Sequence, residues 1–139
     1  MEFNLIALDV GEKRVGVAAA NTVARLANPL TTLVRDDSFW PELEKLLTIE
    51  QPSVILVGLP RNLSGDDTAQ TTATRVFITE LGQHTDVPIE TQDEALTSRQ
   101  AEAELQARGK QFAKADIDAL AATYILEDYL RSQETYHAA

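Results

Sequence analysis

The sequence predicts an α/β fold in which a mixed five-stranded sheet is flanked by helices. Three observations support this fold class. Three apolar segments follow one another near the N-terminus, two further short strands then alternate with helical patterns, and two helical patterns come last. Consecutive strands joined by short turns pair antiparallel, whereas strands separated by a helix usually pair parallel, so we expect a mixed sheet.

The expected strands cover residues 3–9, 14–20, 28–34, 53–59 and 87–91, and the expected helices cover residues 38–49, 68–81, 97–109 and 116–130. A tight turn at Gly11 joins the first two strands. Four large apolar residues fall on one side of the first helix, which Pro52 ends. The fourth strand, "SVILVGL", is rich in β-branched residues and lies between prolines, which is typical of a fully buried strand.

The last three predicted helices are indicated mainly by residues that typically begin or end a helix. Gly82 is expected to close the second helix. Thr97 with Gln100 fits a capping box that opens the third helix, and Gly109 lies near its end. The fourth helix has apolar residues at the helical period. No repeat, low-complexity segment or linker interrupts the sequence, so we expect residues 1–139 to form a single domain.

The composition limits the class of protein. The chain has 139 residues, of which 44% are hydrophobic and 24% charged, as in ordinary globular domains. It has no cysteine, which excludes disulfides, thiolate metal sites and cysteine nucleophiles. We find neither a stretch apolar enough to span a membrane nor a secretory pattern. We therefore expect a cytoplasmic protein without a membrane partner.

The charge balance is strongly acidic. A formal net charge of -10 disfavours non-specific binding of nucleic acid, which depends on neutralising phosphates. The segment "LQARGKQFAKA" departs from this balance, because Arg108, Lys110 and Lys114 occur there without any acidic residue. These three residues form either an ordinary solvated face or an edge that binds a nucleic-acid substrate.

Carboxylates occur where the predicted sheet ends. Asp9 lies at the carboxyl end of the first strand, and Asp93 and Glu94 lie just past "VPIET", which we expect to be parallel to the first strand. Asp118 lies in the first turn of the last helix and is followed by a pair of alanines, which would let that helix approach the sheet closely. We therefore expect Asp9, Glu94 and Asp118 to converge at one edge of the sheet.

Such a group of anions is unstable unless a cation neutralises it. Oxygen ligands without histidine or cysteine favour Mg²⁺ or Mn²⁺, and a pair of such ions commonly serves phosphoryl transfer. Simpler interpretations exist for each residue. Asp9 could shape a turn, Glu94 could be an exposed loop acid, and Asp118 could stabilise a helix start. Asp116 could take that capping role or replace Asp118 as the ligand.

Four segments, in order, resemble the motifs of the YqgF/RuvX family, which has a ribonuclease H-like fold. They are "LDVGEKRVGVA", "VGLPRNLSG", "DEALTSRQAE" and "DALAATYIL", and the resemblance extends from Leu5 to Leu130. It implies that Asp9, Glu94 and Asp118 are the catalytic, metal-binding acids, and it favours Asp118 over Asp116. Members of this family are described as Holliday junction resolvases and as nucleases that mature ribosomal RNA precursors.

The chain departs from the family pattern at three places. Ala95 stands where the family usually has an arginine after Asp-Glu, and Ser64 replaces a frequent aspartate before Gly65. The basic loop before the last helix is reduced to "ARGKQFAK". These departures bear on substrate affinity and activity more than on the fold.

Other polar residues near the expected site are candidates for contacts to backbone phosphates. They are Lys13, Arg14, Arg61 and Asn62. The alternative is that Lys13 and Arg14 are ordinary solvated turn residues and that Asn62 only orders its own loop.

The leading functional hypothesis is a divalent-metal-dependent nuclease acting on structured RNA or branched DNA. The resemblance specifies the 5′ end of the pre-16S ribosomal RNA as the target, with ribosomal particles as partners. One alternative is a Holliday junction resolvase, and another is a weakly active or inactive accessory module that binds nucleic acid or the ribosome. A nucleotide-binding domain of the actin and sugar-kinase type also has Asp-x-Gly after its first strand, but it needs two domains, and this chain has room for one.

Overall fold

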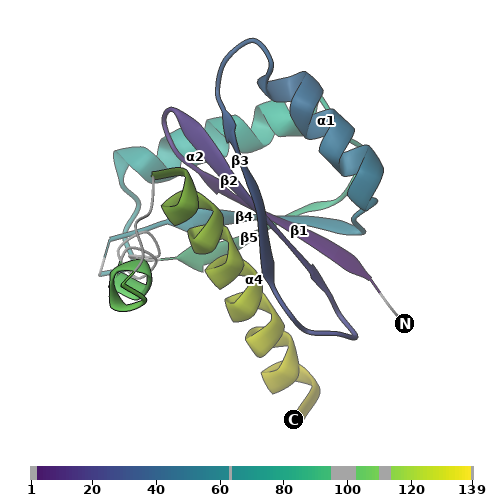
Figure 1. The fold of residues 1–139 in the computed structure, drawn as a ribbon, viewed down its shortest axis with the longest axis vertical. Coiled ribbons are helices and arrows are strands. Elements are labelled where there is room, and N and C mark those ends of the chain that lie inside the picture. Colours follow the sequence, from purple (N-terminus) through teal and green to yellow (C-terminus); the bar gives the residue numbers. More distant parts are fainter. Residues whose placement is uncertain (1–2, 63, 95–102, 110–113, 139) are drawn as a thin grey trace.

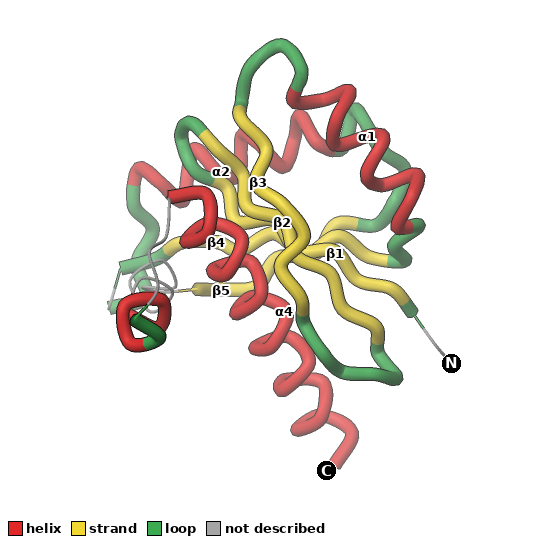
Figure 2. The backbone as a smooth tube through the Cα atoms, in the orientation of Figure 1, coloured by secondary structure: helices red, strands yellow, loops and turns green. Residues whose placement is uncertain are grey.

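A computed structural model describes residues 3–62, 64–94, 103–109 and 114–138. It contains a five-stranded mixed sheet with helices on both faces (Figures 1 and 2), which confirms the predicted fold class. The strands are β1 (Asn4–Val10), β2 (Arg14–Asn21), β3 (Asn28–Val34), β4 (Val54–Pro60) and β5 (Ile89–Glu94). The helices are α1 (Phe39–Glu50), α2 (Ala69–Leu81) and α4 (Lys114–Ala138), and residues 103–107 are also helical.

The strand order is β3-β2-β1-β4-β5. The first three strands form antiparallel pairs, whereas β4 pairs parallel with both β1 and β5. The carboxyl ends of β1, β4 and β5 therefore lie at the same edge of the sheet. This confirms that the strands of Asp9 and Glu94 are parallel, with β4 between them.

Each face of the sheet has its own hydrophobic core. Residues such as Ile6 and Leu8 of β1 pack with α1 and α2 on one face. Leu5 and Ala7 alternate with them and pack with α4 on the other face. Because successive side chains of a strand point to opposite faces, Asp9 continues the series that faces α4.

The predicted boundaries are correct to within about two residues for most elements, and the exceptions are α4 and β5. Helix α4 continues to Ala138, whereas the sequence predicts that it ends near residue 130. The sequence predicts a strand that ends at Thr91, whereas β5 continues to Glu94, paired with Pro60 of β4. Asp93 and Glu94 therefore lie inside the strand and not past its end. The polar segment "TQDE" has no apolar alternation, and its strand conformation comes from pairing with β4.

The helix ends differ from the prediction in three ways. Gly82 does follow α2, but with a φ of -61°, so it does not form a left-handed cap. Left-handed residues at helix ends include Gln51, with a φ of 47°, between α1 and Pro52, and Gly109, with a φ of 68°, just after the helical residues 103–107, near the end that the sequence predicts. Helix α4 begins at Lys114, which places Asp118 in its second turn. The predicted capping box of residues 97–100 lies outside the described residues.

None of the helices in the described ranges is long and apolar enough to cross a membrane.

Candidate active site

Asp9 lies on the sheet face covered by α4, opposite Gly16 of the neighbouring strand β2. Burial, and to a lesser extent the negative charge of Asp118, raises the pKa of the Asp9 carboxyl to about 7. A carboxyl group in this position holds its proton near neutrality unless a cation compensates its charge. Asp9 is therefore a partly buried acid, unlike an ordinary solvated turn residue, and its role as a metal ligand stays a prediction.

Gly16 brings α4 onto the sheet beside Asp9. A Cβ atom at Gly16 would lie 2.0 Å from the carbonyl oxygen of Asp118 and 2.8 Å from the nitrogen of Ala119. The backbone of α4 therefore rests directly on β2. The alanines of α4 were predicted to permit this approach, and Ala121 and Ala122 are fully buried. The glycine on the strand side was missed, although a glycine inside a strand often marks close backbone approach.

Arg14 lies at the start of β2 and forms an ion pair with Asp118. The Nε atom of Arg14 donates a hydrogen bond of 2.8 Å to Oδ2 of Asp118. The side chains are 31% and 18% exposed, respectively, so water reaches the pair only in part. This partner of Asp118 was not expected from the sequence, which indicated Arg14 only as a phosphate contact or a solvated residue.

Glu94 reaches the same face from β5. A Cβ at Gly58 of β4 would lie 2.6 Å from Cδ1 of Ile125 and 3.5 Å from Cγ of Glu94, so Glu94 lies under α4. Its side chain is buried, and Oε1 has no hydrogen-bond partner among the described residues. Burial raises the pKa of Glu94 to about 9, with further contributions from the hydrogen bond and charge of Asp128 and from the charge of Asp9.

Asp128 is therefore a fourth carboxylate near the site. No sequence pattern indicated Asp128 beyond its helical spacing from Ile125 on α4. It also forms an ion pair with Arg131, at 3.2 Å.

The arrangement of these acids bears on metal binding. Asp9 and Glu94 lie on the sheet face that α4 covers, Asp118 belongs to α4, and the charge of Asp118 contributes to the raised pKa of Asp9. Within the described ranges, no three acidic or histidine residues are already close enough to hold an ion. The convergence of the three acids on one ion thus stays a prediction. The oxygen-only donor set and the unpaired buried oxygen of Glu94 fit a hard divalent cation.

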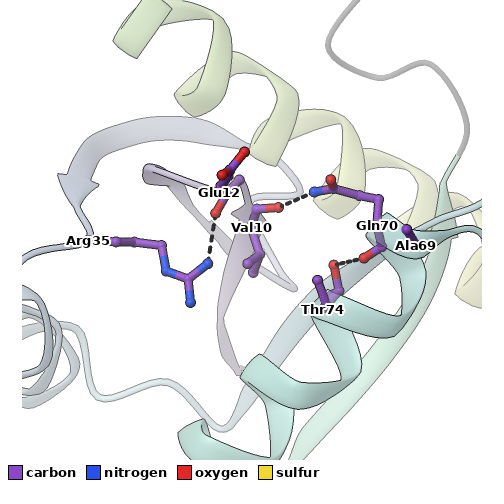
Figure 3. Close-up of a pocket in the computed structure, with 8 residues that line it drawn as sticks. Val10, Glu12, Arg35, Ala69, Gln70 and Thr74 are labelled. Atoms are coloured by element: carbon purple, nitrogen blue, oxygen red, sulfur yellow. Dashed lines mark hydrogen bonds between the residues drawn. The ribbon is translucent and has the colours of Figure 1, made fainter.

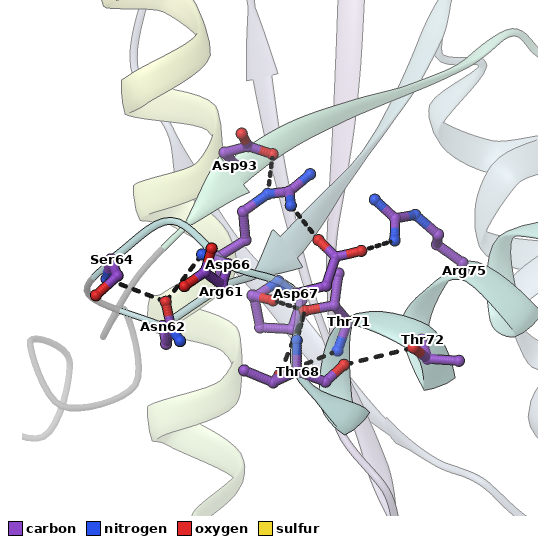
Figure 4. Close-up of polar contacts among 11 residues, drawn as sticks. Arg61, Asn62, Ser64, Asp66, Asp67, Thr68, Thr71, Thr72, Arg75 and Asp93 are labelled. Atoms are coloured by element: carbon purple, nitrogen blue, oxygen red, sulfur yellow. Dashed lines mark hydrogen bonds and ion pairs between the residues drawn. The ribbon is translucent and has the colours of Figure 1, made fainter.

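Asp93 belongs to a different group of charges. It lies next to Glu94 in β5, so its side chain points to the opposite face. Its Oδ1 lies 3.0 Å from Nε of Arg61, and Arg61 also pairs with Asp67, which in turn pairs with Arg75 (Figure 4). Arg61, a predicted phosphate contact, is therefore held between two carboxylates.

Asn62 orders the loop that follows β4. Its Oδ1 accepts hydrogen bonds from the backbone N–H groups of Ser64, at 3.0 Å, and Asp66, at 2.9 Å (Figure 4). This matches the structural alternative considered for Asn62, whereas its contact with phosphate stays a prediction. Lys13 is exposed in the turn between β1 and β2.

The basic segment before α4 is described only in part. Arg108 forms an ion pair of 2.7 Å with Glu104, which also accepts a hydrogen bond from the hydroxyl of Tyr124 in α4. Lys110 lies outside the described residues, as does Ala95. Lys114 is the first residue of α4, and its side chain is not described.

A pocket of about 370 Å³ lies behind the turn that follows Asp9, on the face covered by α1 and α2 (Figure 3). Across it, Nε2 of Gln70 donates to the carbonyl oxygen of Val10, at 3.2 Å, and Nη1 of Arg35 donates to that of Gly11, at 2.9 Å. These bonds hold the turn from α2 and from the segment that follows β3. They fix the end of β1 and therefore the backbone of the site.

Sequence comparisons identify relatives along nearly the whole chain. A family model described as "RuvX: Holliday junction resolvase" matches residues 3–132. A protein of Shewanella denitrificans named "Putative pre-16S rRNA nuclease" is 34% identical, over 96% of this chain and 97% of its own length. A protein of Roseiflexus sp. with the same name is 40% identical, over 93% of this chain and 94% of its own length.

Solved structures agree with this assignment at the level of the fold. The fowlpox virus Holliday junction resolvase superposes with a TM-score of 0.54 at 13% identity, covering 94% of this chain and 99% of that chain. The same viral resolvase bound to Holliday junction DNA gives a TM-score of 0.51 at 14% identity, covering 94% of this chain and 98% of that chain. The sheet and its flanking helices thus have the ribonuclease H-like fold of such resolvases. Together with the motifs around Asp9, Glu94 and Asp118, the match over residues 3–132 shows that the chain belongs to the RuvX family.

Proposed function

We propose that this chain is a divalent-metal-dependent nuclease that matures the 5′ end of pre-16S ribosomal RNA. The family model and the names of the curated relatives indicate a nuclease, a hydrolase of phosphodiester bonds. The observation that carries the metal dependence is Glu94, a buried carboxyl group with an unpaired oxygen on the sheet face that also carries Asp9 and that α4, with Asp118, covers.

The ligands of the proposed site would be Asp9, Glu94 and Asp118. Mg²⁺ or Mn²⁺, as one ion or a pair, would supply activation of the attacking water and stabilisation of the leaving oxygen. The protein's own part is to hold three carboxylates on one rigid face. Without a cation, Asp9 and Glu94 retain protons near neutral pH, because burial raises both pKa values. Loading of the site would therefore release protons.

Ribosomal RNA is the substrate that we propose first. The relatives named for pre-16S rRNA are 34% and 40% identical over most of both chains, whereas the resolvase structures are 13% and 14% identical and indicate the fold alone. The same proposal includes ribosomal particles as partners and the cytoplasm as the location. The Holliday junction is the alternative substrate, favoured by the description of the family model.

A binding module with weak or no catalysis is the second candidate function. One observation favours it: cations that were expected to contact phosphate are already paired with carboxylates. Arg14 pairs with Asp118, Arg61 with Asp67 and Asp93, and Arg108 with Glu104. Substrate affinity would then depend on few free cations.

The test is cleavage of a pre-16S RNA precursor and, in parallel, of a four-way DNA junction, with Mg²⁺ or Mn²⁺ present. We expect the wild type to cleave the RNA, and we expect Asp9→Asn and Asp118→Asn to lower the rate by at least about a hundredfold, since each removes a charged ligand. Asp116→Asn is the matched control, because Asp116 is an exposed acid two residues from Asp118 on the same helix. We expect it to cleave like the wild type.

Each alternative has its own outcome. Cleavage of the junction but not of the RNA would make the protein a resolvase. Binding of RNA without cleavage of either substrate would support the accessory module. Equal cleavage by the wild type, Asp9→Asn and Asp118→Asn would overturn the carboxylate site.

A further inference from the structure

The ion pair between Arg14 and Asp118 connects β2 to α4 at the site. Nε of Arg14 donates to Oδ2 of Asp118 at 2.8 Å, and neither side chain is more than about a third exposed. A guanidinium whose Nε is committed to a protein carboxylate is poorly placed to bind a phosphate through that group. The geometry therefore argues for a role toward Asp118.

The same strand also fixes the backbone of Asp118. Gly16 lies two residues after Arg14, so both residues belong to the face of β2 that α4 covers. The position that a Cβ would take at Gly16 is 2.0 Å from the carbonyl oxygen of Asp118. One strand therefore sets the main chain of Asp118 through Gly16 and its side chain through Arg14.

We infer that Arg14 is a positioning residue that orients the carboxylate of Asp118 for a divalent ion. The inference rests on the proposed function and specifies how this site is preorganised. Arg14 engages Oδ2, so Oδ1 of Asp118 is the oxygen that would be left to hold an ion. Outer partners of this kind fix the orientation of a ligand, and their removal typically weakens metal affinity by about 10–100-fold.

Two other roles for Arg14 make opposite predictions. If Arg14 acted only through its charge, its removal would strengthen the binding of a divalent cation, because a nearby positive charge repels it. If Arg14 were a phosphate contact, its removal would weaken nucleic-acid binding and lower the salt slope by about one, with metal affinity unchanged or raised. A loss of metal affinity is therefore expected only from positioning.

The experiment measures Mn²⁺ binding by titration calorimetry, without nucleic acid, for the wild type, Arg14→Met, Arg14→Lys and Arg75→Met. Arg75→Met is the matched control, because it also removes an ion-paired arginine and changes the net charge equally, on α2 away from the site. We expect Arg14→Met to bind Mn²⁺ at least about tenfold more weakly than Arg75→Met. Arg14→Lys should lie between them, since lysine keeps the charge but lacks the planar Nε contact.

A second readout separates positioning from phosphate binding. RNA binding by fluorescence anisotropy, in EDTA at low salt, is expected to be the same for Arg14→Met and Arg75→Met. If Arg14→Met binds Mn²⁺ as tightly as Arg75→Met or more tightly, the inference is wrong. If Arg14→Met does not fold by circular dichroism, Arg14→Lys replaces it, and a loss smaller than about threefold relative to Arg75→Met overturns the inference.

If the proposed function itself is wrong, the titrations will give a different result from the one that overturns only the role of Arg14. In that case the wild type itself would bind neither Mn²⁺ nor Mg²⁺ at millimolar concentrations. A wild type that binds Mn²⁺ together with an unaffected Arg14→Met would leave the metal site standing and remove only the role assigned to Arg14.

Discussion

Asp9 is a carboxyl group that burial and the charge of Asp118 hold against ionisation, with a pKa raised from 3.8 to about 7. A group whose pKa is higher in the folded than in the unfolded state binds more protons in the folded state between the two values. Its contribution to stability is therefore complete below about pH 4 and is lost as the pH rises through about 7. Without a divalent ion, the ionised site destabilises the fold.

We therefore predict that Asp9→Asn raises the stability of the metal-free protein at alkaline pH. The increase should be roughly 1–3 kcal/mol at about pH 8, because one pKa unit corresponds to about 1.4 kcal/mol and partial exposure reduces the effect. Urea unfolding in EDTA, repeated between about pH 5 and pH 8, measures it. The wild type should lose stability across this range more steeply than the variant, whose remaining slope comes from Glu94.

The control for this prediction is Asp86→Asn, which removes an exposed acid from the segment before β5. It should change stability by less than about 0.5 kcal/mol and keep the pH dependence of the wild type. The same slope for Asp9→Asn and the wild type would mean that Asp9 is not held against ionisation. The interpretation of Asp9 as a residue that shapes a turn would then be preferred.

At the scale of elements, the position of α4 on the sheet depends on two strand glycines, which differ in how well they would accommodate a Cβ atom. A Cβ at Gly16 would collide with helix backbone at 2.0 Å, whereas a Cβ at Gly58 would meet the end of the flexible Ile125 side chain at 2.6 Å. A Cβ at Gly82, just after α2, would meet nothing closer than 3.5 Å. A side chain such as Ile125 can change its rotamer to make room for a Cβ atom, whereas helix backbone cannot. The three glycines should therefore differ in how well they tolerate substitution by alanine.

We predict that alanine substitution destabilises the protein in the order Gly16, Gly58, Gly82. Gly16→Ala should cost about 3 kcal/mol or more, because α4 has to move off β2. Gly58→Ala should cost about 1–2 kcal/mol through a new rotamer of Ile125, and Gly82→Ala should be nearly neutral. Thermal unfolding of the three variants measures the order. Equal stability of Gly16→Ala and Gly82→Ala would contradict the close contact between α4 and β2.

The same elements show how far the sequence predicts this fold. The apolar runs of β1, β2 and β4 and the helical periods of α1 and α2 follow directly from hydrophobic spacing, and their ends agree with the structure to within about two residues. The last residues of β5 could not be predicted in this way. They are polar, and only their pairing with β4, Pro60 with Glu94, makes them a strand.

The candidate site was predictable to a similar degree. The parallel relation of β1 and β5 brings Asp9 and Glu94 to one edge, and chain order alone indicates it. The partners of these acids depend on tertiary contacts over long separations, such as the pairing of Arg14 with Asp118. Local pattern cannot reveal such contacts. The role of Gly16 could have been suspected, since glycine is uncommon inside a buried strand.

For the molecule as a whole, acidic residues outnumber basic ones, and many basic side chains form ion pairs with carboxylates. The chain has 12 lysines and arginines against 22 acidic residues. Among the described side chains, ion pairs with carboxylates are formed by Arg14, Lys45, Arg61, Arg75, Arg108 and Arg131. A paired cation already has its counter-charge on the protein, so it releases few counterions from nucleic acid when it binds.

We therefore predict that RNA binding depends weakly on monovalent salt and strongly on a divalent ion. In EDTA, the slope of log K against log salt concentration should be shallower than about -3, since each phosphate contact to a single strand contributes about -0.7. Millimolar Ca²⁺, as a non-cleaving substitute for Mg²⁺, should strengthen binding by at least about tenfold, because it neutralises the face that carries Asp9, Glu94 and Asp118. Fluorescence anisotropy over a salt series measures both the salt slope and the effect of Ca²⁺. The Lys13→Met variant, which removes an exposed cation beside the site, should make the salt slope shallower by a further unit or less. A slope steeper than about -5 in EDTA, unchanged by Ca²⁺, would show that cations outside the described ion pairs dominate binding, and that the carboxylate face does not contact the nucleic acid.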